Sequence, residues 1–154
     1  MYRLNRLEMV VPRPFLLEVL KLNQDGKIPT SDVAEIFTVV ENYLFRRNIC
    51  DVPTNALNKN LNKEIIRYDN SADNYLSKFI YALTTKKDTA RYPMDDEFKE
   101  AISQKQVYKM RGTFKAYLFE RYENYGTVET KDVFTHLDNN TYSIEHIMPQ
   151  HLTP

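Results

Sequence analysis

The chain has 154 residues, of which 42% are hydrophobic and 27% are charged, so it is long and apolar enough to bury a core and is not a disordered protein. Its 21 basic and 21 acidic side chains give a formal net charge of zero, which argues against a protein that coats nucleic acid through its overall charge. One cysteine and 3 glycines exclude a disulfide framework, a thiolate zinc site and a glycine-rich phosphate loop. The lone cysteine suits a reducing compartment and no apolar run approaches a membrane span, so we expect a cytoplasmic protein that does not enter a membrane.

Apolar residues at helical spacing predict helices through the first half of the chain. The first runs over 15–22, between Pro14 and the Asp25-Gly26 stop. The clearest runs over 30–47, where one face carries Val33, Ile36, Phe37, Val40 and Leu44. Two more are expected, one from Thr54 to about Tyr68 and one from Asn70 to about Leu83, followed by a polar loop over 84–92.

The second half predicts three further helices and one strand. Asp95, Asp96 and Glu97 suit a helix N-terminus after Pro93, a longer helix spans 107–122, and a short one spans 130–137. Over 141–148 apolar and polar residues alternate up to Pro149, which predicts a short strand. We therefore expect an all-α fold, an irregular bundle of about six or seven helices with one short C-terminal strand. The expected domains are a helical domain over 1–126 and a second segment over 127–154.

Glu145 and His146, followed by Pro149, are the most informative residues. An imidazole with a pKa near neutrality can take a proton from water, and an adjacent carboxylate can hold a hard divalent cation. This pair therefore suits metal-assisted hydrolysis of a phosphodiester. On residue chemistry alone, a solvated glutamate beside a partly buried, hydrogen-bonded histidine is the favoured explanation of the pair.

The segment Ser-Ile-Glu-His-Ile-Met-Pro-Gln at 143–150 resembles the opening of the HNH (His-Me finger) nuclease domain of GmrSD-type, modification-dependent (type IV) restriction enzymes. The segment 117–124 resembles the helix that precedes the E-H-x-x-P motif in that family. The segment 43–50, with 53–58 after it, resembles the family's R-R-x-I-C-x-x-P-T-N sequence. The three segments occur in the family's order.

The resemblance implies that His146 is the general base, that Glu145 helps to hold Mg²⁺ or another divalent metal, and that Pro149 closes the motif. It also implies a DNA substrate, a role in phage defence and an N-terminal ParB-like, nucleotide-using domain. The strand and helix that complete the ββα-metal finger in this family have no counterpart here. We therefore expect this chain to be part of a longer nuclease, with no tightly bound metal and no cleavage of its own.

Other residues support weaker predictions. Six cations are candidate contacts to the DNA backbone, although helix-dipole pairing and solvation explain them as well: Arg46, Arg47, Lys105, Lys109, Arg111 and Lys115. His136, His151 and Cys50 are interpreted as structural, and most tyrosines and phenylalanines as core. The alternative function is a helical interaction or DNA-binding module without catalysis. An unpaired terminal strand would favour a homodimer.

Overall fold

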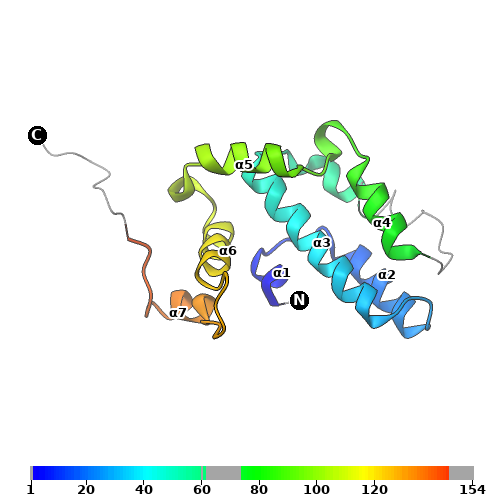
Figure 1. Cartoon of the computed structure of the whole chain (residues 1–154), viewed down its shortest axis with the longest axis horizontal. Helices are drawn as coiled ribbons and strands as arrows, with labels where there is room; N and C mark the ends of the chain where they lie inside the picture. The colour runs from blue at the N-terminus through cyan, green and yellow to red at the C-terminus, as the bar shows by residue number, and fades with distance from the viewer. Residues whose placement is uncertain (1, 60, 62–73, 146–154) are drawn as a thin grey trace, which may run out of the picture. The chain divides into compact units, whose positions relative to one another are not determined.

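The computed structural model describes residues 2–59, 61 and 74–145. Within them the fold is all-α, as predicted, with α-helices α1 to α7 and no strand (Figure 1). The chain divides into two compact units, Met1–Val107 (unit 1) and Tyr108–Pro154 (unit 2), which are treated separately below. The predicted boundary after residue 126 follows from the nuclease motif and stays a prediction.

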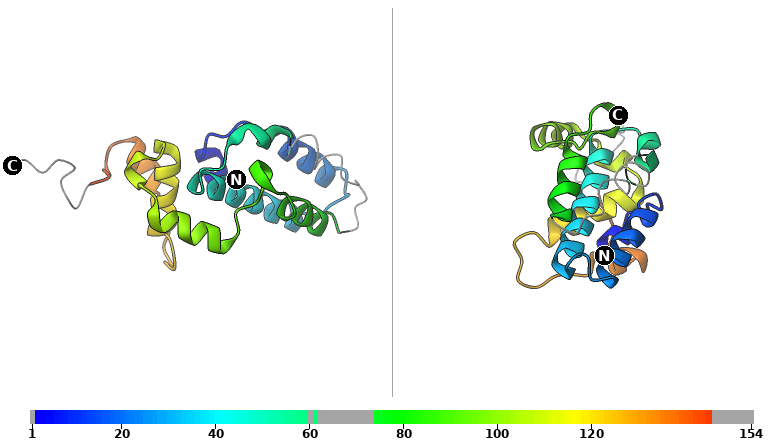
Figure 2. Two further views of the ribbon diagram at one scale, coloured as in Figure 1. Left: turned by 90° about the horizontal axis from the view of Figure 1, so that it is seen from above. Right: turned by 90° about the vertical axis from the view of Figure 1, so that its right-hand side faces the viewer.

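Unit 1 is built around its longest helix, α3 (Thr30–Ile49). Helices α1 (Tyr2–Arg6), α2 (Arg13–Gln24), α4 (Tyr75–Thr84) and α5 (Asp95–Gln104) each pack against it (Figures 1 and 2). Two single turns of 3₁₀ helix, η1 (Thr54–Ala56) and η3 (Asp88–Ala90), lie in the connections and contact each other. The helix α1 has too few residues to show an apolar period, and the sequence did not predict it.

The predicted apolar face of α3 is buried, since its five members are at most 8% exposed. Tyr43, Phe45 and Ile49 on other faces are buried as well. This follows from the packing, because a helix covered by four others must be apolar over most of its circumference. Phe15 of α2 and Phe79 of α4 stack at 5.1 Å between ring centroids and continue the core beyond α3.

Arg47, near the end of α3, is a charged residue that is only 2% exposed. Its Nη1 donates to the carbonyls of Thr89 (2.8 Å) and Arg91 (3.3 Å) and to the Tyr43 hydroxyl, and its Nη2 donates to the Pro53 carbonyl. Burial lowers the pKa of the guanidinium, while the Tyr43 hydroxyl opposes that shift. A buried cation is tolerated because carbonyl oxygens replace its water, so Arg47 fastens two loops to the helix.

Arg46 and Lys105 connect the C-terminal end of α3 to α5 and to the segment before α5. Arg46 donates to the Pro93 carbonyl (3.0 Å) and to Asp95 Oδ1 (2.6 Å), and its guanidinium lies 4.9 Å from the Phe98 ring centroid. Lys105 donates to the Asn48 carbonyl (3.1 Å) and to Asp51 Oδ1 (2.6 Å) at the C-terminal end of α3. These cations therefore meet the negative end of the α3 dipole and tie it to α5.

Unit 2 contains α6 (Gly112–Glu123) and α7 (Val133–Asp138), which pack against each other. The single helix expected over 107–122 is divided, because a 3₁₀ turn, η4 (Val107–Lys109), ends before the α-helix begins at Gly112. Glycine is a poor interior helix residue and is tolerated at the start of one, which explains the break. The α7 helix corresponds to the predicted helix over 130–137.

The predicted strand over 141–148 is not formed at 141–145, and 146–148 lie outside the described residues. In place of ladder bonds, the Tyr142 amide donates to the His136 carbonyl (2.9 Å) and the Thr141 amide donates to Asn139 Oδ1 (3.0 Å). Alternation of apolar and polar residues gives a strand only where a second strand can pair with it. The described part of the chain offers no such strand, so local turn bonds prevail.

Parts of two predicted helices also lie outside the described residues. The helix expected from Thr54 is seen as η1 followed by helical residues 57–59, and Leu61 beyond them is buried. The helix expected from Asn70 begins at Tyr75 in the described residues and ends at Thr84.

The Arg47→Leu variant should lose about 3–5 kcal/mol of unfolding free energy, because the carbonyls that the guanidinium satisfies would be left buried without a donor. Urea denaturation measures this loss. The matched control is Arg13→Leu, at an exposed position on α2, which should change stability by no more than about 0.5 kcal/mol. Equal effects of the two substitutions would contradict the anchoring role of Arg47.

Candidate functional site

Glu145 is the one member of the E-H-x-x-P motif inside the described residues; His146, Pro149 and the nearby His151 lie outside them. The Glu145 side chain is exposed, and its Oε1 accepts a hydrogen bond from the Ser143 hydroxyl at 2.7 Å. Its backbone carbonyl accepts a hydrogen bond from the Tyr108 hydroxyl, also at 2.7 Å. The residue that precedes His146 in the sequence is thus held by a side chain from the start of unit 2.

The segment before Glu145 is held against α7. The rings of His136 and Tyr142 lie 4.5 Å apart at 31°, and the Tyr142 amide bonds to the His136 carbonyl. His136 is half-buried, and its Nδ1 has no hydrogen-bond partner among the residues that the structure describes. The structural interpretation of His136 agrees with this position, because its ring supports Tyr142.

Asn124, just after α6, holds the connection between α6 and α7. Its Oδ1 accepts from the Lys131 amide (2.7 Å), and its Nδ2 donates to the Lys131 carbonyl (3.0 Å) and to Oε1 of the buried Glu120 (3.0 Å). Lys131 also forms an ion pair with Glu123 of α6, which raises the pKa of the Lys131 ammonium. One asparagine therefore closes the connection between α6 and α7.

A groove of about 490 Å³, which we call the tyrosine groove, runs beside Glu145 in unit 2. Its lining combines aromatic and aliphatic side chains with one lysine and two glutamates: Tyr108, Phe119, Tyr122, Glu123, Lys131, Val133, Leu137, Tyr142, Ser143, Ile144 and Glu145. The interpretation of most tyrosines as core is wrong in this unit. Tyr122 is 80% exposed, Tyr125 is 86% exposed, and Tyr108 and Tyr142 are each 40% exposed.

The sequence did not predict this groove, because helical spacing places an aromatic residue on a face but does not show whether that face is covered. Tyr117 and Tyr122 both lie on the helix predicted over 107–122, yet Tyr117 is 1% exposed and Tyr122 is 80% exposed. The α6 helix packs against α7, and Tyr122 remains exposed beside that contact.

A metal site is not assembled by the described residues, which contain no cluster of three or more His, Cys, Asp or Glu side chains able to hold an ion. Glu145 supplies a single carboxylate there. Mg²⁺ prefers a near-octahedral shell of oxygen ligands, so this carboxylate alone does not fit the ion.

Three of the six candidate DNA contacts lie in unit 1, where each of them has structural partners. Arg47 is buried in α3 and its Nη atoms are hydrogen-bonded to carbonyls, which favours the structural role considered from the sequence; its contact with DNA stays a prediction. Arg46 and Lys105 keep side-chain exposures of 22% and 14%, with their donors directed at Asp95, Asp51 and carbonyl groups. Charge pairing and dipole complementation, the alternatives considered from the sequence, account for these cations.

The other three candidates lie in unit 2. Lys109 and Arg111 are exposed, and the half-buried Lys115 donates to the Tyr108 carbonyl at 3.3 Å. Their contact with DNA stays a prediction. Cys50, by contrast, lies in unit 1, where its thiol faces the Glu97 carbonyl (3.9 Å) and where burial raises its pKa, as suits an unreactive thiol.

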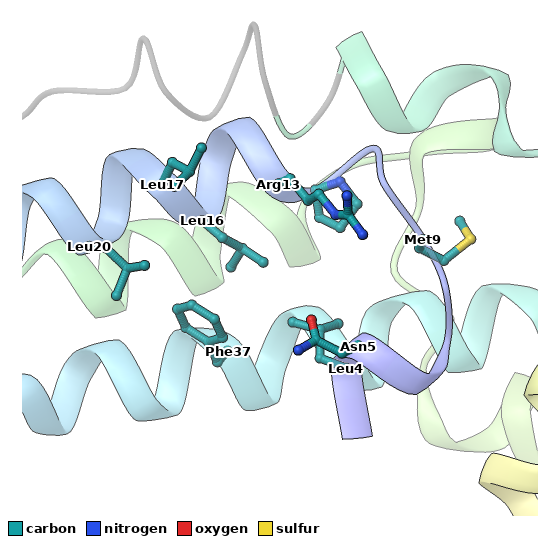
Figure 3. Close-up of a pocket in the computed structure, with 9 residues that line it drawn as sticks. Leu4, Asn5, Met9, Arg13, Leu16, Leu17, Leu20 and Phe37 are labelled. Carbon is teal, nitrogen blue, oxygen red and sulfur yellow. The ribbon is translucent and has the colours of Figure 1, made fainter. Parts of the chain in front are cut away.

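A second cavity, of about 240 Å³, lies between α1, α2 and α3 in unit 1 (Figure 3). Its lining is mostly apolar: Leu4, Asn5, Met9, Pro12, Arg13, Leu16, Leu17, Leu20 and Phe37. It has no carboxylate, imidazole or thiol among these residues, so it offers no group for acid–base or nucleophilic chemistry.

Residues 92–154 match the family model of the C-terminal domain of GmrSD restriction endonucleases. The resemblance carried by the E-H-x-x-P motif is thereby confirmed for this part of the chain. The segment 43–58 lies outside the matched residues, so its resemblance stays a prediction. Neither a curated protein nor a solved structure matches the chain. None of the described helices combines the length and apolar character of a membrane span.

The Tyr108→Phe variant should lose the hydrogen bond to the Glu145 carbonyl and keep the ring. Amide hydrogen exchange in residues 141–145 should then become about two- to tenfold faster, as expected for the loss of one net hydrogen bond that resists local opening. Exchange read by mass spectrometry measures this. The control is Tyr125→Phe, an exposed tyrosine of the same unit that does not line the groove; unchanged exchange in Tyr108→Phe would contradict the tether.

Proposed function

We propose that residues 92–154 belong to a DNA endonuclease of the modification-dependent restriction type. The observation that supports the proposal is the match to the C-terminal domain of GmrSD restriction endonucleases over these residues. The E-H-x-x-P sequence at 145–149 falls within the match. The reaction is hydrolysis of a phosphodiester bond in DNA.

In this proposal His146 is the general base. Its imidazole takes a proton from the attacking water, the water oxygen bonds to phosphorus, and the bond from phosphorus to the leaving sugar oxygen breaks. Glu145 would supply one ligand to a divalent metal, and the charge of such an ion would stabilise the negative charge that develops on the phosphate. Pro149 limits the backbone conformations open to the residues before it.

The hydrogen bonds that restrain Glu145 support the proposal. A carboxylate that must meet a metal benefits from a backbone fixed in advance, since ordering it during binding would cost entropy. The Tyr108 and Ser143 hydrogen bonds provide that restraint. The remaining ligands, the ParB-like nucleotide-using partner domain and the kind of DNA modification are expectations from the resemblance.

DNA binding in this proposal uses Lys109, Arg111 and Lys115, which lie within the family match. Cations that contact phosphates contribute a sequence-independent, salt-dependent term to affinity. We leave Arg46, Arg47 and Lys105 out of this set, because their donors are engaged within unit 1.

The test is a Mg²⁺- or Mn²⁺-dependent cleavage assay on glucosylated and otherwise modified DNA, with unmodified DNA beside it. It uses the present chain and the longest natural chain that contains it. We expect cleavage by the longer chain, with loss of at least about a hundredfold in His146→Ala, the scale of a general base, and retained DNA binding. Undiminished cleavage by His146→Ala would overturn the assigned base.

The role of Glu145 has a matched control in the same unit. Glu145→Gln should reduce cleavage and raise the metal concentration required for half-maximal rate, because the amide keeps the shape and loses the charge. Glu129→Gln, at an exposed position outside the motif, should leave both unchanged. No cleavage by any chain would overturn the nuclease and favour the alternative, a helical interaction or DNA-binding module.

A further inference from the structure

The tyrosine groove gathers exposed aromatic side chains in one place. Among the described residues of unit 2 four tyrosines are exposed, and three of them, Tyr108, Tyr122 and Tyr142, line this one groove. Exposed aromatic rings are costly to solubility and usually mark a binding surface. None of the roles assigned above to His146, Glu145 or the basic residues uses these three rings.

Two of the three rings are fixed in place although they are exposed. The Tyr108 hydroxyl is hydrogen-bonded to the Glu145 carbonyl, and Tyr142 is held by the His136 ring and by its own amide bond. The third, Tyr122, projects from α6 and is therefore on a rigid element. A ligand that stacks here meets surfaces that are already ordered, so little entropy is lost on binding.

Charge in the groove points to the kind of ligand. Lys131 is paired with Glu123, which leaves the second carboxylate, Glu145, as the excess charge of the lining. Such a lining repels a phosphate and accepts a neutral, flat group. A carboxylate also accepts a hydrogen bond from an exocyclic amino group, as acidic side chains do from cytosine N4.

We propose that the tyrosine groove binds one unpaired nucleobase that carries an exocyclic amino group, stacked on Tyr122 and Tyr142 with its amino edge toward Glu145. The proposal rests on the proposed function, since it supplies the part of the DNA substrate that lies beside Glu145. The groove volume of about 490 Å³ lies in the range of pockets for small ligands. Base–aromatic stacking is a main source of affinity in proteins that bind single strands.

The probe is a fluorescein-labelled deoxycytidine strand of about ten nucleotides, a length within the usual range for single-strand sites. Its binding to the whole chain is measured by anisotropy without metal, so that no cleavage takes place. The comparison strands are an abasic strand of the same length and a thymidine strand, which lacks the exocyclic amino group. We expect the deoxycytidine strand to bind tightest and the abasic strand weakest.

The deciding variants are Tyr122→Ala and Tyr125→Ala. Both positions are at least 80% exposed, so neither substitution should unfold the chain, and circular dichroism verifies this. Tyr122→Ala should weaken binding of the deoxycytidine strand at least about fivefold and leave the abasic strand nearly unchanged, whereas Tyr125→Ala should alter neither.

Equal binding of the deoxycytidine and abasic strands, equal effects of the two variants, or no binding of either strand would overturn the groove proposal and leave the groove to a protein segment. These outcomes are separate from the cleavage assay. Cleavage that requires His146 together with a failed stacking test would overturn the groove alone. Base binding without cleavage by any chain would overturn the nuclease alone.

Discussion

The buried guanidinium of Arg47 is the interaction on which unit 1 depends. A cation that is 2% exposed would be strongly unfavourable without partners, and its partners are carbonyl oxygens of Pro53, Thr89 and Arg91. Those carbonyls belong to loops that have few apolar residues of their own to bury. The hydrogen bonds from Arg47 therefore hold the loops against α3, and the loop carbonyls replace the water that would otherwise solvate the guanidinium.

Residues next to Arg47 in the sequence also contact the segment 92–97. Arg46 reaches Pro93 and Asp95, Cys50 faces Glu97, and the Tyr43 ring stacks on Tyr92 at 5.7 Å. The family match begins at Tyr92. The first residues of the matched region are thus held by α3, which lies outside it, so the packing of unit 1 gives the 43–58 segment a structural role that is independent of DNA contact.

The helices were predictable because burial of an apolar stripe is a local property of the sequence, as the five stripe residues of α3 show. Arg47 was not, because its burial depends on carbonyls 42 and 44 residues away along the chain. The strand at 141–148 was predicted from alternation. At 141–145 the turn bonds of Tyr142 and Thr141 replace it, because the described residues contain no strand that could pair with it. At the site, the sequence identified Glu145 but not Tyr108, since nothing in a lone tyrosine 37 residues earlier indicates that its hydroxyl meets that carbonyl.

The same tether relates the motif to the groove. Tyr108 uses its hydroxyl to hold the backbone of Glu145 and contributes its ring to the lining of the tyrosine groove. Ser143 acts on the carboxylate, so backbone and side chain of Glu145 are restrained by different groups. A ligand stacked in the tyrosine groove would therefore lie against Tyr108, whose hydroxyl holds the backbone of Glu145. Because two hydrogen bonds fix one residue, movement of the ring and movement of Glu145 are coupled, and occupancy of the groove would stabilise the arrangement that presents the carboxylate.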